Sequence, residues 1–164
     1  MPSILFVCSA NRYRSPLAAA FFSQCLEKTA DAGKYSVSSA GTWAKPGLPP
    51  DGRAARDAQE WGLNIKTHRS RQIDAAILSH SDLVLVMEAG QKEALQIEFP
   101  RERDKIFMVS EVAEGLSYDI PDPFDPDGPT HQEITSELFA LIKRGFDKIL
   151  TLSDHKSTEA RPTS

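Results

Sequence analysis

Cysteine is scarce in this sequence, since Cys8 and Cys25 are the only two among 164 residues. Two thiols make a poor disulfide framework for a chain of this length, so we expect a packed core to hold the fold. The four histidines are scattered, and no grouping of Cys and His has the spacing of a zinc site. We therefore expect no metal.

Long apolar runs are also missing, and none approaches the length of a membrane-spanning helix. Polar residues interrupt the first apolar stretch at Cys8 and again from Asn11 to Arg14, so the N-terminus does not resemble a secretory signal. The net charge of −4 argues against nucleic acid and acidic membrane surfaces as partners. These absences predict a cytoplasmic protein that binds neither nucleic acid nor membrane.

What is present is the composition of one globular domain, with 40% hydrophobic and 26% charged residues. Short apolar runs predict strands, and the segments between them have helical spacing or helix-start signals. The predicted strands are 3–7, 35–38, 81–87 and 105–109, and the predicted helices are 15–33, 51–61, 91–99 and 134–149. This alternation predicts an α/β domain with a parallel sheet over residues 1–152. The polar residues 153–164 lack periodicity and are expected to form a disordered tail.

The segment from Cys8 to Arg14 follows the first predicted strand, at the edge of the sheet where ligands of α/β domains bind. The next two residues, Ser15 and Pro16, make a good helix start with Ser15 as the cap. Backbone N–H groups of a tight turn at a helix N-terminus bind anions, and we call residues 8–14 the phosphate loop for that reason. Arg14 adds a planar guanidinium that matches two phosphate oxygens.

Cys8 stands at the mouth of this loop, where the positive field favours a thiolate over a thiol. A thiolate below a bound phosphoryl group is a nucleophile in line with phosphorus. Asn11 tolerates a left-handed conformation, and Ser15 can hydrogen-bond the sulfur. The alternative is that Cys8 is a small buried hydrophobic residue, which is the usual role of a lone cysteine.

The stretch Val7-Cys8-Ser9-Ala10-Asn11-Arg12-Tyr13-Arg14-Ser15-Pro16 resembles the active-site loop of low-molecular-weight protein tyrosine phosphatases. The resemblance continues to about residue 150, with ordered matches at Ser38 to Thr42, Asp51 with Arg53-Ala54, His68 with Ser70 to Gln72, Asp82 to Met87, and Asp122-Pro123-Phe124. It implies a doubly wound four-stranded parallel sheet with flanking helices and a phosphate-binding loop between the first strand and the first helix. It also implies that no cofactor is needed.

The resemblance further implies a phosphomonoester hydrolase, most simply a protein tyrosine phosphatase with a phosphocysteine intermediate. Cys8 is then the nucleophile, Arg14 the phosphate clamp and Asp122 the general acid. The partner that the resemblance implies is a phosphotyrosine-containing protein, with a tyrosine kinase as one candidate. The loop residues expected to bind the substrate are Ser9, Ala10, Asn11, Arg12 and Tyr13.

A general acid must protonate the leaving oxygen, and the proline-rich segment 120–129, which we call the acid loop, contains three aspartates. The match to Asp-Pro-aromatic selects Asp122 over Asp125 and Asp127. Phe124 and Trp43 are expected to form walls for a flat substrate ring, with ordinary packing as the alternative for both.

The resemblance also assigns supporting residues. Ser39 and His68 are expected to join a polar network that supports Asn11, and Glu88 is expected to contact Arg14 or to hold the loop shape. Cys25 is expected to be buried, because its spacing places it on the apolar face of the first helix.

Three positions depart from the common pattern of the family. Ala10 replaces a frequent glycine, and Tyr13 replaces a second cysteine that can protect the nucleophile as a disulfide. Arg12 replaces an aliphatic residue and either favours acidic substrates or faces solvent.

Other functions remain open at this point. An arsenate reductase of the same fold would bind its oxyanion in the same loop but needs a resolving thiol, either Cys25 or an external one. A non-catalytic phosphate-binding module would have no use for a thiolate or an acid. A phosphatase acting on phosphoarginine or on a small phosphoester would differ only in its pocket walls.

Overall fold

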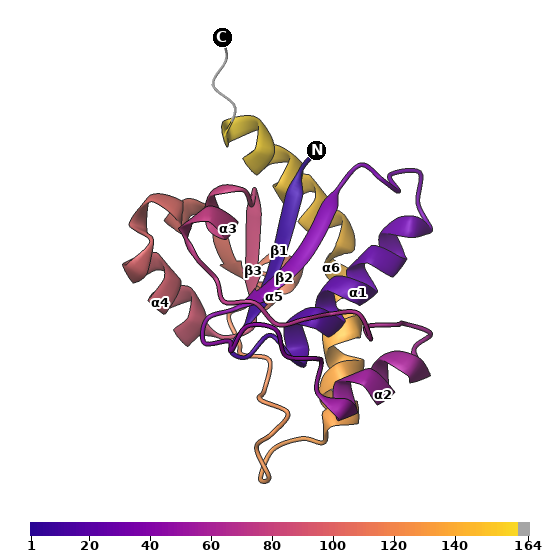
Figure 1. Cartoon of the computed structure of the whole chain (residues 1–164). Helices are drawn as coiled ribbons and strands as arrows, with labels where there is room; N and C mark the ends of the chain where they lie inside the picture. The colour runs from indigo at the N-terminus through magenta and orange to yellow at the C-terminus, as the bar shows by residue number, and fades with distance from the viewer. Residues whose placement is uncertain (161–164) are drawn as a thin grey trace.

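The sheet positions the site. The structure, a computed structural model, describes residues 1–160. Four parallel strands are arranged in the order β2-β1-β3-β4. They are β1 (Ser3–Cys8), β2 (Ser36–Gly41), β3 (Leu83–Val86) and β4 (Ile106–Met108). Since all four run in one direction, their carboxyl ends meet at the lower edge of the sheet in Figure 1. The predicted α/β class with a four-stranded parallel sheet is confirmed.

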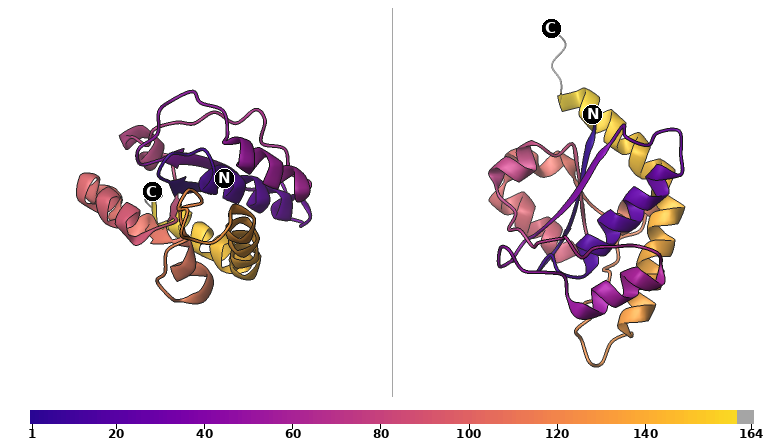
Figure 2. Two further views of the ribbon diagram at one scale, coloured as in Figure 1. Left: turned by 90° about the horizontal axis from the view of Figure 1, so that it is seen from below. Right: turned by 45° about the vertical axis from the view of Figure 1, so that its right-hand side comes forward.

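Helices cover both faces of this sheet (Figures 1 and 2). They are α1 (Arg14–Glu27), α2 (Gly52–Glu60), α3 (Ala75–Ser79), α4 (Ala89–Glu98), the 3-10 helix η1 (Pro100–Lys105), α5 (Val109–Glu114) and α6 (His131–Ala160). The chain moves from β1 to β2 through α1, and in the opposite direction from β3 to β4 through α4. Because such crossovers are right-handed, α1 and α4 lie on opposite faces, as a doubly wound sheet requires.

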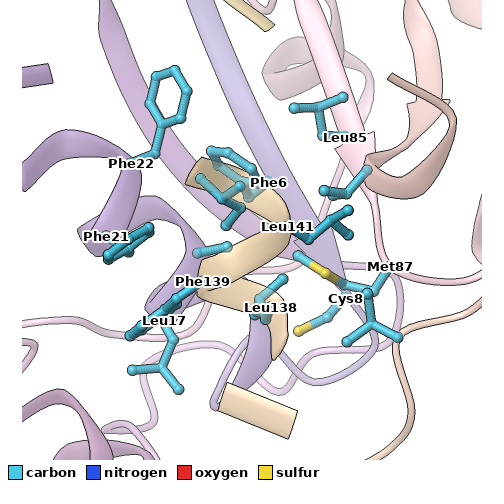
Figure 3. Close-up of a cluster of buried hydrophobic side chains, with 14 of the residues drawn as sticks. Phe6, Cys8, Leu17, Phe21, Phe22, Leu85, Met87, Leu138, Phe139 and Leu141 are labelled. Carbon is cyan, nitrogen blue, oxygen red and sulfur yellow. The ribbon is translucent and has the colours of Figure 1, made fainter. Parts of the chain in front are cut away.

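The two cores follow from the alternation of side chains along β1. Ile4, Phe6 and Cys8 belong to the cluster covered by α1, α5 and α6, whereas Leu5 and Val7 belong to the cluster covered by α3 and α4. Figure 3 shows Cys8 near one end of the first cluster, close to Met87 and Leu138 in that view. The parity of β1 therefore directs the Cys8 sulfur toward α1 and α6.

Two expectations about the local structure near the phosphate loop were wrong. The strand predicted to end at residue 38 continues through residues 39–41, because β2 pairs along its whole length with β1 and places Gly41 opposite Cys8. A Cβ built at Gly41 would lie 2.5 Å from the Ser9 carbonyl oxygen, so glycine permits this close approach. Helix α1 begins at Arg14 with no side-chain cap, and Ser15 makes other hydrogen bonds.

The expected disordered tail from residue 153 onward was also wrong for the residues that the structure describes. Helix α6 continues to Ala160, and Ser153 and Ser157 are buried on it. These small residues follow Ile149 at intervals of four, so they extend the buried face of the helix although they are polar. Residues 161–164 of the predicted tail lie outside the described part of the chain.

None of the helices within residues 1–160 combines the length and the apolar character that a bilayer span requires.

Candidate active site

The phosphate loop joins β1 to α1 at the carboxyl end of the sheet. Among residues 1–160, no acceptor receives a hydrogen bond from the backbone N–H groups of residues 9 to 13. These donors precede a 14-residue helix whose own first N–H groups are also free of intrahelical partners. Unpaired N–H groups beside a helix N-terminus form a site for an anion such as phosphate.

Cys8 is the first residue of this loop and is 2% exposed. The Ser15 hydroxyl oxygen is 2.9 Å from the Cys8 sulfur. The Asn11 side-chain amide donates to the same hydroxyl oxygen at 2.8 Å, so that oxygen already acts as an acceptor. The other neighbour of the Ser15 hydroxyl is the Ala40 carbonyl oxygen at the longer distance of 3.5 Å. Because a thiolate can only accept, Ser15 donates to Cys8 whenever the sulfur is ionised, and this hydrogen bond stabilises the negative charge.

Asn11 is fully buried and has a φ of 58°, and it is the non-glycine residue at positive φ among residues 1–160. Its amide nitrogen donates to the Ser39 hydroxyl at 3.0 Å, and its side-chain oxygen accepts from the Arg71 backbone N–H at 3.0 Å. The His68 Nε2 atom is 2.7 Å from its carbonyl oxygen. Every polar group of the Asn11 side chain has a partner, so the network fixes the left-handed turn.

His68 acts as a donor in this network. A carbonyl oxygen only accepts hydrogen bonds, so the Nε2 atom beside Asn11 must carry a hydrogen. Burial lowers the pKa of His68, although the hydrogen bond to Asn11 opposes that effect. His68 is therefore neutral at neutral pH, with its hydrogen on Nε2.

Arg14 is the last residue of the loop and is 4% exposed. One of its terminal nitrogens, Nη1, donates to the Glu88 carboxylate at 3.0 Å and to the Ile120 carbonyl oxygen at 2.8 Å. Glu88 thus contacts Arg14, as expected. Gln91 donates to the same Glu88 oxygen at 2.9 Å and to the Ser9 hydroxyl at 3.0 Å. The carboxylate of Glu88, at the start of α4, and the carbonyl oxygen of Ile120, at the start of the acid loop, therefore hold the guanidinium in place.

Gln91 is a loop contact that the sequence prediction missed. Its side-chain oxygen also accepts from the backbone N–H groups of Met87 and Glu88, which makes it the third residue of the capping box that starts α4. The available signal was the Glu-x-x-Gln spacing from Glu88 to Gln91, which is typical of a helix start.

The three departures from the family pattern have different structural settings. Ala10 is exposed and does not adopt positive φ, so it needs no glycine. The Arg12 side chain extends to the Pro49 carbonyl oxygen at 2.9 Å. Tyr13 is 3% exposed, and its hydroxyl donates to Asp57 below the loop. Only the backbone N–H of Tyr13 is thus available to an anion in the loop.

The acid loop is attached to the same region. Its first residue, Ile120, donates its N–H to the Met87 carbonyl oxygen at 2.9 Å and accepts from Arg14. Asp122, two residues later, is exposed, and its Oδ1 atom accepts the Phe124 backbone N–H at 2.9 Å. Asp119, in contrast, accepts the Ala89 N–H at 2.8 Å at the start of α4. Asp122 is therefore the first aspartate in the chain after Ile120, whose carbonyl oxygen accepts the hydrogen bond from Arg14.

The expected wall residues are both exposed, so neither is part of the core. Trp43 is 87% exposed, and its backbone N–H donates to the Ser9 carbonyl oxygen at 2.9 Å. Phe124 is 46% exposed; its ring lies 6.2 Å from the Tyr13 ring in an edge-on arrangement. The Arg53 guanidinium lies 4.5 Å from the centre of the Phe124 ring. The Phe124 ring thus packs against the phosphate loop, whereas Trp43 is joined to that loop through its backbone.

Cys25, the second thiol, is half-buried against the same core as α1, which is less burial than the sequence suggested. Burial raises its pKa. Both cysteines are free thiols. The part of the chain that the structure describes contains no group of three or more His, Cys, Asp or Glu side chains arranged to hold a metal ion.

The comparisons with known proteins agree with this geometry. Residues 3–159 match the model of the family described as low molecular weight phosphotyrosine protein phosphatase. A probable low-molecular-weight protein-tyrosine-phosphatase, EpsP, from Ralstonia nicotianae is 33% identical over 147 residues, which cover 88% of this chain and 91% of that protein. A protein-arginine-phosphatase from Geobacillus stearothermophilus is 34% identical over 148 residues, which cover 90% of this chain and 96% of that protein.

A solved structure supports the same assignment. It is the arginine phosphatase YwlE as a cysteine-to-serine mutant with a phosphorylated active-site serine. It superimposes with a TM-score of 0.82 at 29% sequence identity, over 90% of this chain and 95% of that one. This chain belongs to the family of low-molecular-weight phosphotyrosine protein phosphatases and is a protein phosphatase.

Proposed function

We propose that this protein hydrolyses phosphotyrosine in proteins through a phosphocysteine intermediate, with Cys8 as nucleophile, Arg14 as phosphate clamp and Asp122 as general acid. The observation that carries the proposal is the Cys8 sulfur, 2.9 Å from a donating Ser15 hydroxyl, within a loop of unpaired backbone N–H groups. Neither a structural cysteine nor a simple phosphate-binding module has a use for that donor. The phosphorylated serine that stands at a cysteine position in the mutant YwlE structure supports a covalent intermediate.

In the first step, the N–H groups of residues 9 to 13 and the Arg14 guanidinium bind the phosphoryl oxygens. The Cys8 thiolate attacks phosphorus, so that a phosphorus–sulfur bond forms while the bond to the phenolic oxygen breaks. The electron pair of the broken bond goes to that oxygen, which takes a proton from Asp122.

In the second step, water attacks the phosphocysteine. Asp122, now a carboxylate, accepts the proton from water, and the phosphorus–sulfur bond breaks with its electrons returning to Cys8. Ser15 donates to the sulfur as it leaves, which stabilises the restored thiolate. Inorganic phosphate is then released, and the enzyme returns to its starting state.

Phosphotyrosine is the favoured substrate class because of what surrounds the loop. The exposed Phe124 ring packs on Tyr13 of the loop, and the exposed Trp43 is hydrogen-bonded to Ser9 through its backbone, so both rings are available to a substrate ring. The cationic side chains of Arg12 and Arg53 also lie here, with Arg53 paired to Asp51 at 3.3 Å, and like charge disfavours the guanidinium group of a phosphoarginine. They attract acidic residues next to a phosphotyrosine, so an autophosphorylated tyrosine kinase is a suitable partner.

Phosphoarginine is the second candidate, since an arginine phosphatase is as similar to this chain as a probable tyrosine phosphatase is. Arsenate reduction is disfavoured, because the resolving thiol it requires would have to be the half-buried Cys25 on α1 or an external thiol. We place the reaction in the cytoplasm, where the reducing conditions keep a nucleophilic thiol such as Cys8 reduced.

The test is a set of peptides of one sequence that carry phosphotyrosine, phosphoserine or phosphoarginine. We expect kcat/KM to be highest for phosphotyrosine. Cys8→Ser should abolish turnover but retain vanadate binding, while the matched variant Cys25→Ser should keep turnover. Rapid acid quenching of the wild type should trap phosphate on Cys8. A higher kcat/KM for the phosphoarginine peptide would show that phosphoarginine, and not phosphotyrosine, is the substrate class. Normal turnover by Cys8→Ser would refute the covalent mechanism.

A further inference from the structure

A buried carboxylate, Asp57, is hydrogen-bonded to the phosphate loop through Tyr13 and takes no part in the proposed reaction. Asp57 on α2 is 2% exposed. Its Oδ2 atom accepts the Tyr13 hydroxyl, lies 2.9 Å from the His131 Nδ1 atom and accepts the Thr135 hydroxyl at 2.9 Å. A buried carboxylate is strongly destabilising without such partners. The three donors thus hold Asp57 in place, and Asp57 in turn holds them together.

These donors come from the two segments that must cooperate in the proposed reaction. Tyr13 is the residue of the phosphate loop directly before α1. His131 is the first residue of α6, and Thr135 is one turn later. Because the acid loop ends immediately before α6, the Asp57 carboxylate links the end of the acid loop to the phosphate loop. In Figure 1 the same arrangement places α2 beside the first turns of α6.

The link also reaches the middle of the acid loop. The Phe124 ring, two residues after Asp122, packs edge-on against the Tyr13 ring at 6.2 Å. Its face is covered by the Arg53 guanidinium at 4.5 Å, and Arg53 lies one helical turn before Asp57 on α2. The acid loop is therefore held at two points by groups that Tyr13 and α2 provide.

Tyr13 remains a donor in this arrangement. Burial, together with the hydrogen bond to Asp57, raises the pKa of Tyr13 well above its ordinary value. The phenol therefore keeps its proton at neutral pH and remains a hydrogen-bond donor to Asp57.

We propose that Tyr13 and Asp57 are positioning residues that set the acid loop over the phosphate loop, so that Asp122 meets the leaving oxygen. The inference rests on the proposed role of Asp122 as general acid. Neither side chain contacts the reacting atoms, and the variants below leave the Tyr13 backbone N–H in place. Loss of the link moves the acid but leaves the phosphate site intact, so it slows only those reactions that need a proton delivered to the leaving group.

Tyr13→Phe is the sharpest variant, because it keeps the ring below Phe124 and removes only the hydroxyl. We expect kcat for a phosphotyrosine peptide to fall about 10- to 100-fold, and kcat for nitrophenyl phosphate to fall less than about threefold. Vanadate affinity should not change. Asp57→Asn, which removes the charge but keeps the shape, should give the same pattern.

Tyr35→Phe is the matched control. Its hydroxyl donates to the Asp154 carboxylate at 2.8 Å near the opposite end of the sheet, so the variant also deletes a tyrosine–carboxylate hydrogen bond. Kinetic constants for both esters should be unchanged in it. The melting temperature of every variant is recorded. If Tyr13→Phe does not fold, the Asp57→Asn variant provides the test.

Two outcomes overturn the inference, and they can be told apart. If Asp122→Asn, assayed alongside, slows the poor leaving group selectively but Tyr13→Phe and Asp57→Asn slow both esters equally, the cluster is only structural and the positioning role is wrong. If Asp122→Asn itself has no selective effect, the proposed acid is wrong, and the positioning role fails with it.

Discussion

The Ser15 hydroxyl oxygen lies 2.9 Å from the Cys8 sulfur and accepts the Asn11 side-chain amide at the same time. This double role orients its hydrogen toward the sulfur. The donor is fixed before a substrate arrives, because Asn11 is buried and fully hydrogen-bonded.

Removal of that donor should affect breakdown of the intermediate most. In Ser15→Ala the sulfur becomes a poorer leaving group, and we expect kcat to fall by about 10²-fold. Rapid-quench measurements should show a larger burst of released phenol than in the wild type, because phosphocysteine accumulates. Ser23→Ala, a half-buried serine later on α1, is the control. An unchanged kcat in Ser15→Ala would show that the hydroxyl has no role in turnover.

Arg14→Lys tests whether charge alone is sufficient for the clamp. Lysine keeps the positive charge and can still pair with Glu88, but it loses the planar fork that holds two phosphoryl oxygens. We expect kcat/KM to fall by about 10²–10³-fold with little change in melting temperature. Arg56→Lys, on the exposed side of α2, should be neutral. If Arg14→Lys retained full activity, a point charge would suffice and the fork would be irrelevant.

Asp122→Asn should reveal the acid through its dependence on the leaving group. We expect turnover of a phosphotyrosine peptide to fall by about 10²–10⁴-fold, and turnover of nitrophenyl phosphate to fall less. The basic limb of the pH–rate profile should flatten, because that limb reports loss of the acid proton. Asp125→Asn, which alters a neighbouring exposed carboxylate that accepts the Asp127 N–H, should change neither property. If Asp125→Asn showed the leaving-group dependence and Asp122→Asn did not, Asp125 would be the general acid.

His68 should make stability depend on pH. Burial lowers its pKa below the ordinary value of 6.5, so the unfolded chain binds this proton more readily than the folded protein does. The stabilising contribution is fully present above about pH 6.5 and is lost as pH falls toward the lowered folded value. His68→Asn should therefore reduce the fall in unfolding free energy below pH 6.5, as measured by urea denaturation. The exposed His80→Asn is the control, and an equal slope in both variants would contradict the assignment.

The sequence predicted the elements whose signals are local and strong. Strands β1 and β3 are continuous apolar runs, and both were found. Helices α3 and α5 were missed because five and six residues are too few to show a helical period. The last part of α6 was missed because buried serines have the polarity of an exposed face.

The phosphate loop could be predicted from the sequence, whereas the Tyr13–Asp57 hydrogen bond could not. The loop from Cys8 to Arg14 is contiguous, so its spacing was visible in the sequence. The Tyr13–Asp57 hydrogen bond joins residues 44 positions apart, and no local pattern indicates such a pairing. A buried carboxylate on a helix with an otherwise polar sequence looks like an exposed one until the packing is known.

Helix α6 begins beside the acid loop and ends at Ala160, at the other end of the molecule (Figure 1). The N-terminus also lies at that far end, next to the amino ends of the strands. A solid support or a fluorescent fusion attached through Met1 would therefore stand away from the phosphate loop. An immobilised enzyme of this kind leaves the loop open to a folded phosphoprotein, so single-molecule or surface-based turnover measurements need no redesign of the chain.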